Sequence, residues 1–322
     1  MYSWKRHTHI GCLTVAVVAG ALLLWTMPVL ADCGSIPYRT PYDRDPEVVE
    51  AVAARSRSPV RFDPTGVVVY EPGQRAIILW NGHEEILLLS TDIRTSQDVS
   101  ILEVIPLPSE PQVRRGDFDS FKKMNARLAD RKVWYVSVLG GLRPISPAAT
   151  ITFHEKMGAH DIAVANVLDK DRFVGWVMGF LAGKGVANPQ IRPEFVQIIG
   201  SYLDRGFTWF VFDTIKTADR LQSRQPIEYR FQSDSVFYPI EISSLETGRT
   251  TIDLTVVTKS RLTSFSNIRF ASRKTVGARV TPRDLDRVSP GWTKFMNASQ
   301  LSVDRVQIKG DIRYLTTDFV AR

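Results

Sequence analysis

Two histidines beside carboxylates form the one cluster whose residue types suit metal or acid–base chemistry. The cluster consists of His154, Glu155, His160 and Asp161. A zinc-binding helix would need His-Glu-x-x-His, but Gly158 stands four residues after His154, so this motif is absent. If residues 156–158 form a three-residue hairpin loop, His154 and His160 face each other and can bind a metal with a third, unidentified ligand. The alternative is an exposed polar hairpin without a metal, which we favour.

Other catalytic patterns are missing from the sequence. The Gly183-Lys184-Gly185 segment lacks the spacing of a phosphate-binding loop and follows a predicted helix, which it would end. There is no Gly-x-Ser-x-Gly motif, and Cys33 has no histidine nearby in the sequence. We therefore expect no cofactor and favour a non-enzymatic binding or structural protein. A metal-assisted extracytoplasmic hydrolase that uses His154 and His160 is the alternative.

The first 31 residues have the three parts of a secretory signal peptide. Lys5 and Arg6 precede an uncharged apolar run from Ile10 to Leu30, and Ala31 ends a small-residue cleavage site. We therefore predict a periplasmic or secreted protein of the cell envelope. Left uncleaved, the run of about 20 apolar residues would anchor the chain as a membrane-bound subunit of an envelope complex. A lipid on Cys33 is a third reading.

The positive charge is concentrated in one segment. Without the two cations of the signal peptide, the chain has 39 basic and 34 acidic residues, yet residues 259–294 hold nine basic residues against two acidic ones. This segment, with a net charge of +7, can face an anionic partner such as acidic lipid headgroups or a polyanion. Well-spaced solvated charges are the alternative, and we favour it because no run reaches five like charges. Nucleic acid is not an expected partner, because no basic–aromatic stacking motif is present.

Hydrophobic periodicity predicts an α+β fold. Helical spacing of apolar residues indicates helices that begin at Asp45 and Pro193 and helices over 117–129 and 173–181. β-branched and aromatic runs indicate strands at 67–70, 76–80, 85–90, 99–105, 133–139, 151–154, 161–167, 207–215, 227–232, 236–243, 250–259, 262–270, 303–308 and 312–315. The Asn81-Gly82 pair predicts a hairpin turn. Because strands and helices do not alternate, we expect mostly antiparallel sheets with several amphipathic helices packed on one side.

The expected organisation has three parts. They are a signal peptide over 1–31, an α+β domain over 32–245, and a β-rich basic part over 246–322 that packs on the same domain. The boundary falls in the Gly/Thr/Ser-rich stretch 244–251.

Several segments together resemble a known family. They are Cys33-Gly34, Gln74–Ile78, Val104–Ser109, the helix at Phe118, Gly158–Val164, the helix at Trp176, Gln225–Ile227, Tyr238–Ile240 and Leu315-Thr316. In this order they resemble the secreted prokaryotic domain-of-unknown-function family numbered 2330. Members of that family often have further cysteines soon after the first Cys-Gly, and this chain has none. The resemblance implies export and one family domain, and it implies no activity or catalytic residues.

Overall fold

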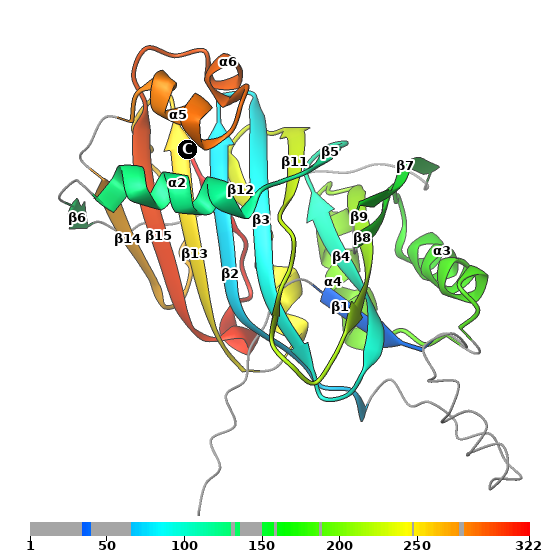
Figure 1. The fold of residues 1–322 in the computed structure, drawn as a ribbon. Coiled ribbons are helices and arrows are strands. Elements are labelled where there is room, and N and C mark those ends of the chain that lie inside the picture. Colours follow the sequence, from blue (N-terminus) through cyan, green and yellow to red (C-terminus); the bar gives the residue numbers. More distant parts are fainter. Residues whose placement is uncertain are drawn as a thin grey trace, which may run out of the picture.

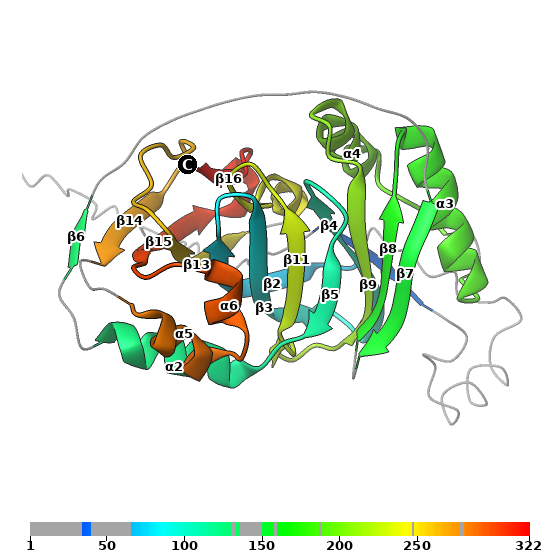
Figure 2. The same ribbon diagram turned by 90° about the horizontal axis from the view of Figure 1, so that it is seen from above.

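The computed structural model describes residues 34–39, 66–129, 133–135, 150–157, 160–186, 189–246, 248–276 and 280–322 (Figure 1). Their strands form a nine-stranded sheet, a five-stranded sheet and a short two-stranded pair. Seen from above, the two large sheets lie side by side (Figure 2). Almost all neighbouring strands are antiparallel, so the predicted α+β class with mostly antiparallel sheets is confirmed.

The nine-stranded sheet holds strands from both halves of the sequence. Its order is β5 (Gln112–Arg115), β11 (Ile227–Gln232), β3 (Glu84–Thr95), β2 (Val69–Trp80), β13 (Arg249–Thr258), β15 (Ser302–Asp311), β14 (Ala271–Val276) and β6 (Val133–Tyr135). The two-residue β10 (Gln222–Ser223) also pairs with β3. The pair β2–β13 is parallel, which places residues 249–258 directly beside residues 73–80.

The five-stranded sheet has the order β1 (Gly34–Tyr38), β4 (Val99–Leu107), β9 (Trp209–Thr217), β8 (His160–Asn166) and β7 (Thr150–Met157). Helices α3 (Lys170–Gly183) and α4 (Pro193–Asp204) cover one of its faces. There the Phe173 ring stacks on Phe195 at 6.2 Å between centroids and contacts Phe210 and Phe212 of β9. The predicted apolar stripes of both helices therefore form the core under this sheet.

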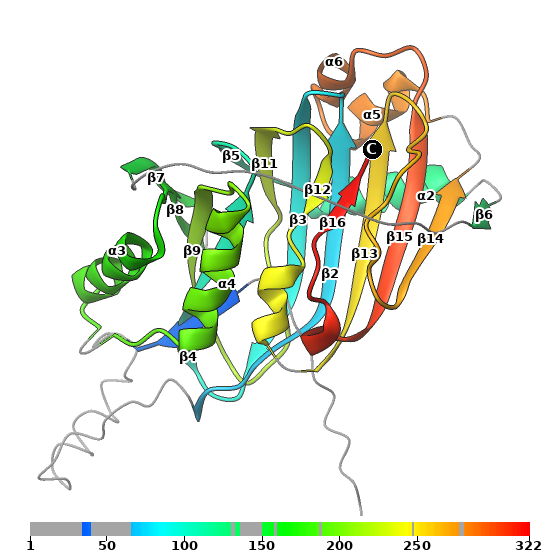
Figure 3. The same ribbon diagram turned by 180° about the vertical axis from the view of Figure 1, so that it is seen from behind.

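The nine-stranded sheet is covered on both faces. Helices α2 (Phe118–Ala129), α5 (Pro282–Val288) and α6 (Trp292–Met296) pack on one face against β2 and β3. The other face carries the pair β12 (Val236–Tyr238) and β16 (Phe319–Ala321), with the 3₁₀ helices η3 (Glu241–Leu245) and η4 (Ile312–Tyr314) (Figure 3). None of the helices in the described ranges is long and apolar enough to cross a membrane.

Buried Asp318 fastens the C-terminal segment to this second face. Its carboxylate accepts hydrogen bonds from the Tyr202 hydroxyl at 2.6 Å and from the backbone N–H of Ile240 at 2.8 Å. Arg205 pairs with its other oxygen at 3.1 Å. Burial raises the pKa of Asp318, and these donors act in the opposite direction.

Two predicted strands are absent from the structure, and a third is shorter than predicted. Residues 262–270 form an irregular segment with one isolated bridge at Phe265, so the predicted strand there is wrong. The predicted strand 312–315 is the 3₁₀ helix η4, because the Asp311 side chain caps the N–H of Arg313. The predicted strand 236–243 stops at Tyr238, where η3 follows.

Strand β4 is longer than the strand predicted at residues 99–105. It continues through Pro106 to Leu107. Because β1 pairs only with residues 100–104, the missing proline donor breaks no bond to β1. The helix predicted at Asp45 lies outside the described residues.

Candidate functional site

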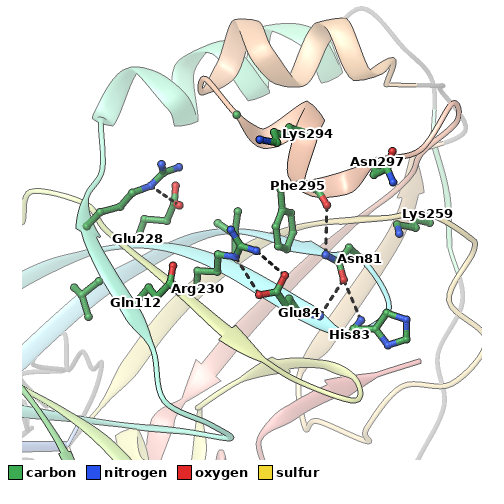
Figure 4. A pocket seen from close by; sticks show the side chains of 14 residues that line it. Asn81, His83, Glu84, Gln112, Glu228, Arg230, Lys259, Lys294, Phe295 and Asn297 are labelled. Atoms are coloured by element: carbon green, nitrogen blue, oxygen red, sulfur yellow. Dashed lines mark hydrogen bonds and ion pairs between the residues drawn. The ribbon is translucent and has the colours of Figure 1, made fainter. Parts of the chain in front are cut away.

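A pocket of about 700 Å³ opens where the helical layer over the nine-stranded sheet stops (Figure 4). Apolar side chains of Ile86, Val113 and Phe295 line it, from β3, β5 and α6. Around them lie the β2–β3 turn, the first part of β11 and the residues that flank α6. The pocket therefore brings together positions from 81 to 297 in the sequence.

The two carboxylates of the pocket are already neutralised. Arg230 contacts Glu84 with two guanidinium nitrogens, at 3.2 and 2.6 Å, and its guanidinium carbon lies 5.2 Å from the centroid of the Phe295 ring. Buried Glu228 accepts from Arg114 Nε at 2.6 Å and from Trp292 Nε1 at 3.0 Å. Each carboxylate is therefore balanced by an arginine, which weakens its repulsion of an incoming anion.

The remaining polar side chains of the pocket can all donate hydrogen bonds, and two of them are positively charged. Lys259 and Lys294 are exposed, and no described residue gives either ammonium a hydrogen-bond or ion-pair partner. The amides of Gln112 and Asn297 and the ring of His83 also line the pocket without such a partner in the described part of the chain. An anion that enters therefore meets two unpaired positive charges and neutral N–H groups.

Local backbone geometry fixes the walls of the pocket. Asn81 Oδ1 accepts the N–H groups of His83 and Glu84 at 3.0 and 2.9 Å, and Gly82 has a φ of 102°, as the predicted Asn-Gly turn requires. The Asn81 amide also donates to the Phe295 carbonyl at 3.3 Å, which joins the turn to α6. The pocket is thus bounded by a hairpin and a helix that are bonded to each other.

A buried charge cluster lies where the two large sheets meet. Arg224, between β10 and β11, is held by its backbone to β3: its N–H donates to the Thr91 carbonyl at 2.7 Å, and its carbonyl accepts from Ser90 at 3.0 Å. Its guanidinium reaches the five-stranded sheet and pairs with Glu103 of β4 and, at 2.7 Å, with Asp213 of β9. Arg224 therefore bonds both sheets at once.

His160 completes the cluster. Its Nδ1 contacts Asp213, and its Nε2 lies 3.1 Å from the Gln225 carbonyl. Both ring nitrogens therefore face oxygen acceptors, and Nδ1 also lies 3.3 Å from Arg224 Nη2. Glu103, Asp213 and His160 are all at most 2% exposed. Burial raises the pKa of Asp213, and its bond to His160 opposes that shift.

The structure separates the two histidines predicted as metal ligands. The β7–β8 register pairs His154 with Ala163 and His160 with Met157, so the expected three-residue loop with His154 opposite His160 is wrong. Since strand positions alternate between faces, positions 154 and 160 belong to different faces of the sheet. The side chain of His154 lies outside the description, and no group of three or more metal-ligating residues occurs among the described ones. The metal site remains a prediction without the geometry on which it was based.

The basic segment seen in the sequence reaches the pocket, whereas neither the pocket nor the buried charge cluster was predicted. The two ends of the basic segment, Lys259 and Lys294, both line the pocket. Glu103 and Asp213 stand inside otherwise apolar strands, and that placement was the available signal for a buried charge cluster. Nothing in the sequence connects them to Arg224, because the contact depends on how the two sheets meet.

The comparisons identify the family. A family model described as an uncharacterized protein conserved in bacteria, DUF2330, matches residues 64–315. Neither a curated protein nor a solved structure matches the chain. The match covers most of the sequence, so the chain belongs to the DUF2330 family, as the resemblance of its segments indicated.

Proposed function

We propose that this member of the DUF2330 family is an exported, non-enzymatic binding protein of the cell envelope, and that its pocket binds an anionic ligand. The observation that carries the proposal is a pair of ammonium groups, Lys259 and Lys294, that have no partner among the described residues, in a pocket whose carboxylates are already bonded to arginines or tryptophan. Export is supported by the charge and apolar pattern of residues 1–31.

The arrangement of the pocket favours a ligand with both charge and an apolar part. Lys259 and Lys294 supply charge from two separate elements, the end of β13 and helix α6. Phe295, Ile86 and Val113 supply apolar surface between the polar groups. A small organic anion can therefore pair with the ammonium groups and cover the Phe295 ring at the same time.

Calorimetric titration with citrate and with inorganic phosphate tests the proposal. We expect saturable binding of at least one of these probes, which weakens as salt is added. The double variant Lys259→Gln, Lys294→Gln should weaken binding by about tenfold or more, because each surface charge contributes about 1 kcal/mol.

A matched control separates the pocket from general surface charge. The double variant Lys123→Gln, Lys170→Gln removes the same charge from exposed positions on α2 and α3, away from the pocket. It should bind the probe like the unmodified protein. Equal weakening by both double variants, or no saturable binding of either probe, would contradict an anion site in the pocket.

A further inference from the structure

A second surface lies at the opposite end of the nine-stranded sheet from the pocket. Phe270 and Tyr314 are two of the four exposed large hydrophobic side chains in the described part of the chain, at 45% and 51% exposure. The guanidinium carbon of Arg269 is 5.1 Å from the centroid of the Phe270 ring and 5.0 Å from that of Tyr314. We call these three residues the aromatic–arginine platform.

The position of the platform follows from the strand register. Phe270 directly precedes β14, whose first residue, Ala271, pairs with Ile308, which in turn pairs with Ile252 near the start of β13. Lys259 of the pocket follows the other end of β13. Over this strand the two surfaces are separated by roughly 20–30 Å, at about 3.3 Å per residue. The platform is therefore independent of the pocket.

Phe270 has a backbone conformation that is unusual for a bulky residue. Its φ is 65°, in the left-handed region, which a bulky L-residue rarely occupies and which costs about 1–3 kcal/mol. Gly310 of β15 makes room for its ring, because a Cβ at Gly310 would overlap it. A glycine or asparagine at position 270 would avoid both the strain and the exposed ring. The exposed phenyl ring at this position therefore carries a backbone cost, which is a common property of functional residues.

Arg269 has no carboxylate partner in the part of the chain that the structure describes. None of the described residues gives it a hydrogen-bond or ion-pair partner, and its side chain is exposed. The two flanking rings restrict the guanidinium by cation–π contact while its N–H groups stay accessible. A guanidinium held in this way is suited to bidentate pairing with a carboxylate.

We propose that the aromatic–arginine platform binds an acidic saccharide. Arg269 pairs with the carboxylate of a uronic acid, and the C–H faces of the sugar rings stack on Phe270 and Tyr314. The Phe270 ring lies against the backbone of β15, so it offers a flat surface and does not project as a wedge for a bilayer. The neighbouring cation Arg313 is paired with Asp311 at 2.6 Å, so its charge is already balanced.

Titration with trigalacturonate, with maltotriose as the neutral comparison, tests this site. The measurement is made in the unmodified protein and in the Lys259→Gln, Lys294→Gln variant, in which the pocket is disabled. We expect both proteins to bind trigalacturonate and neither to bind maltotriose comparably. In the pocket variant, adding Arg269→Gln should weaken binding by about tenfold, because a charge-assisted hydrogen-bonded pair is lost. Tyr314→Ala should weaken it by a few fold.

The Phe270→Gly variant separates a loss of binding from a loss of folding. Phe270→Gly can adopt the φ of 65° without strain, so it should keep the unfolding midpoint while it weakens trigalacturonate binding. The platform is ruled out if trigalacturonate fails to bind the pocket variant, if maltotriose binds equally, or if the platform variants leave the affinity unchanged. Loss of binding to phosphatidylglycerol vesicles or oligothymidylate in these variants, without an effect on trigalacturonate, would instead assign the platform to a membrane or a nucleic acid. Because the pocket variant isolates the platform, either site can fail without the other.

Discussion

At the residue scale, the unusual feature of this protein is the number of carboxyl groups held away from water. Glu85 on β3 is fully buried; one oxygen accepts the Phe237 N–H at 2.7 Å, and the other has no partner among the described residues. Burial raises the pKa of Glu85 well above its ordinary value, and the single backbone donor only partly opposes this. Glu85 therefore differs from Glu103 and Asp213, whose charges are balanced by Arg224.

Glu85 predicts a loss of stability as pH rises. Its pKa is higher in the folded than in the unfolded chain. At pH values between the unfolded pKa of about 4.3 and the folded pKa, the folded state therefore binds more protons than the unfolded state. The free energy of unfolding should fall across this interval and level off above the folded pKa. Glu85→Gln keeps the acceptor for Phe237 and should remove that fall, which makes the variant more stable than the parent at pH 8.

Urea unfolding at a series of pH values measures this effect. Glu110→Gln, which removes an exposed carboxylate instead, serves as the control and should leave the pH profile unchanged. A profile for Glu85→Gln that runs parallel to that of the unmodified protein would show that this carboxyl does not titrate as proposed.

At the scale of elements, Arg224 joins the two large sheets through its backbone and side-chain bonds. The segment that carries it is bonded to β3 by its backbone, and its side chain crosses to β4 and β9. Gln225 adds a second crossing, because its carbonyl faces His160 and its amide donates to the Gly116 carbonyl at 2.8 Å. These bonds lie beside the apolar contacts of Val69 and Ile101 that join the sheets.

Arg224→Met should therefore destabilise the protein by about 3–5 kcal/mol, because Glu103 and Asp213 would remain buried without their cation. Arg94→Met is the matched control: it breaks the Arg94–Asp219 pair at 2.7 Å, whose side chains are 44% and 56% exposed. That change should cost less than about 1 kcal/mol. Similar losses in the two variants, measured by denaturant unfolding, would argue against a structural role for the buried cluster.

The sequence predicted elements well where one local signal dominated. Helix α3 has the apolar spacing that predicted it, and Asp169 caps its start by accepting the Arg172 N–H at 2.8 Å. The short helices α5 and α6 were missed, although Thr281 and Asp284 form a capping box that could have indicated α5. The segment 262–270 has apolar residues but packs them from irregular backbone, which local pattern does not distinguish from a strand.

At the scale of the whole molecule, the pocket could not be predicted as a site, because it depends on tertiary packing. Its residues come from a hairpin turn, three strands and the ends of a short helix that the sequence did not reveal. The parallel pairing of β13 with β2 brings Lys259 next to the Asn81 turn, about 180 residues away in the chain. The sequence shows the excess of cations over residues 259–294, but it does not show that both ends of this segment line one cavity.

The apolar and charge pattern of residues 1–31 predicts that the protein is exported. Cell fractionation followed by mass spectrometry of the intact protein should give an N-terminus at Asp32 in the soluble extracytoplasmic fraction. An intact Met1 or a lipid on Cys33 in the membrane fraction would instead make the protein an anchored envelope component. Recovery in the cytoplasm with Met1 present would contradict export.

The most direct test of the central claim is to locate a bound anion on the protein by NMR. In a citrate titration of the ¹⁵N-labelled protein, the largest saturable amide shifts should occur at His83, Glu84, Gly291 and Asn297, which line the pocket. The Lys259→Gln, Lys294→Gln variant should lose them. Shifts spread over exposed cations such as Lys123 and Lys170, with none concentrated at the pocket, would contradict the proposal that this cavity is an anion-binding site.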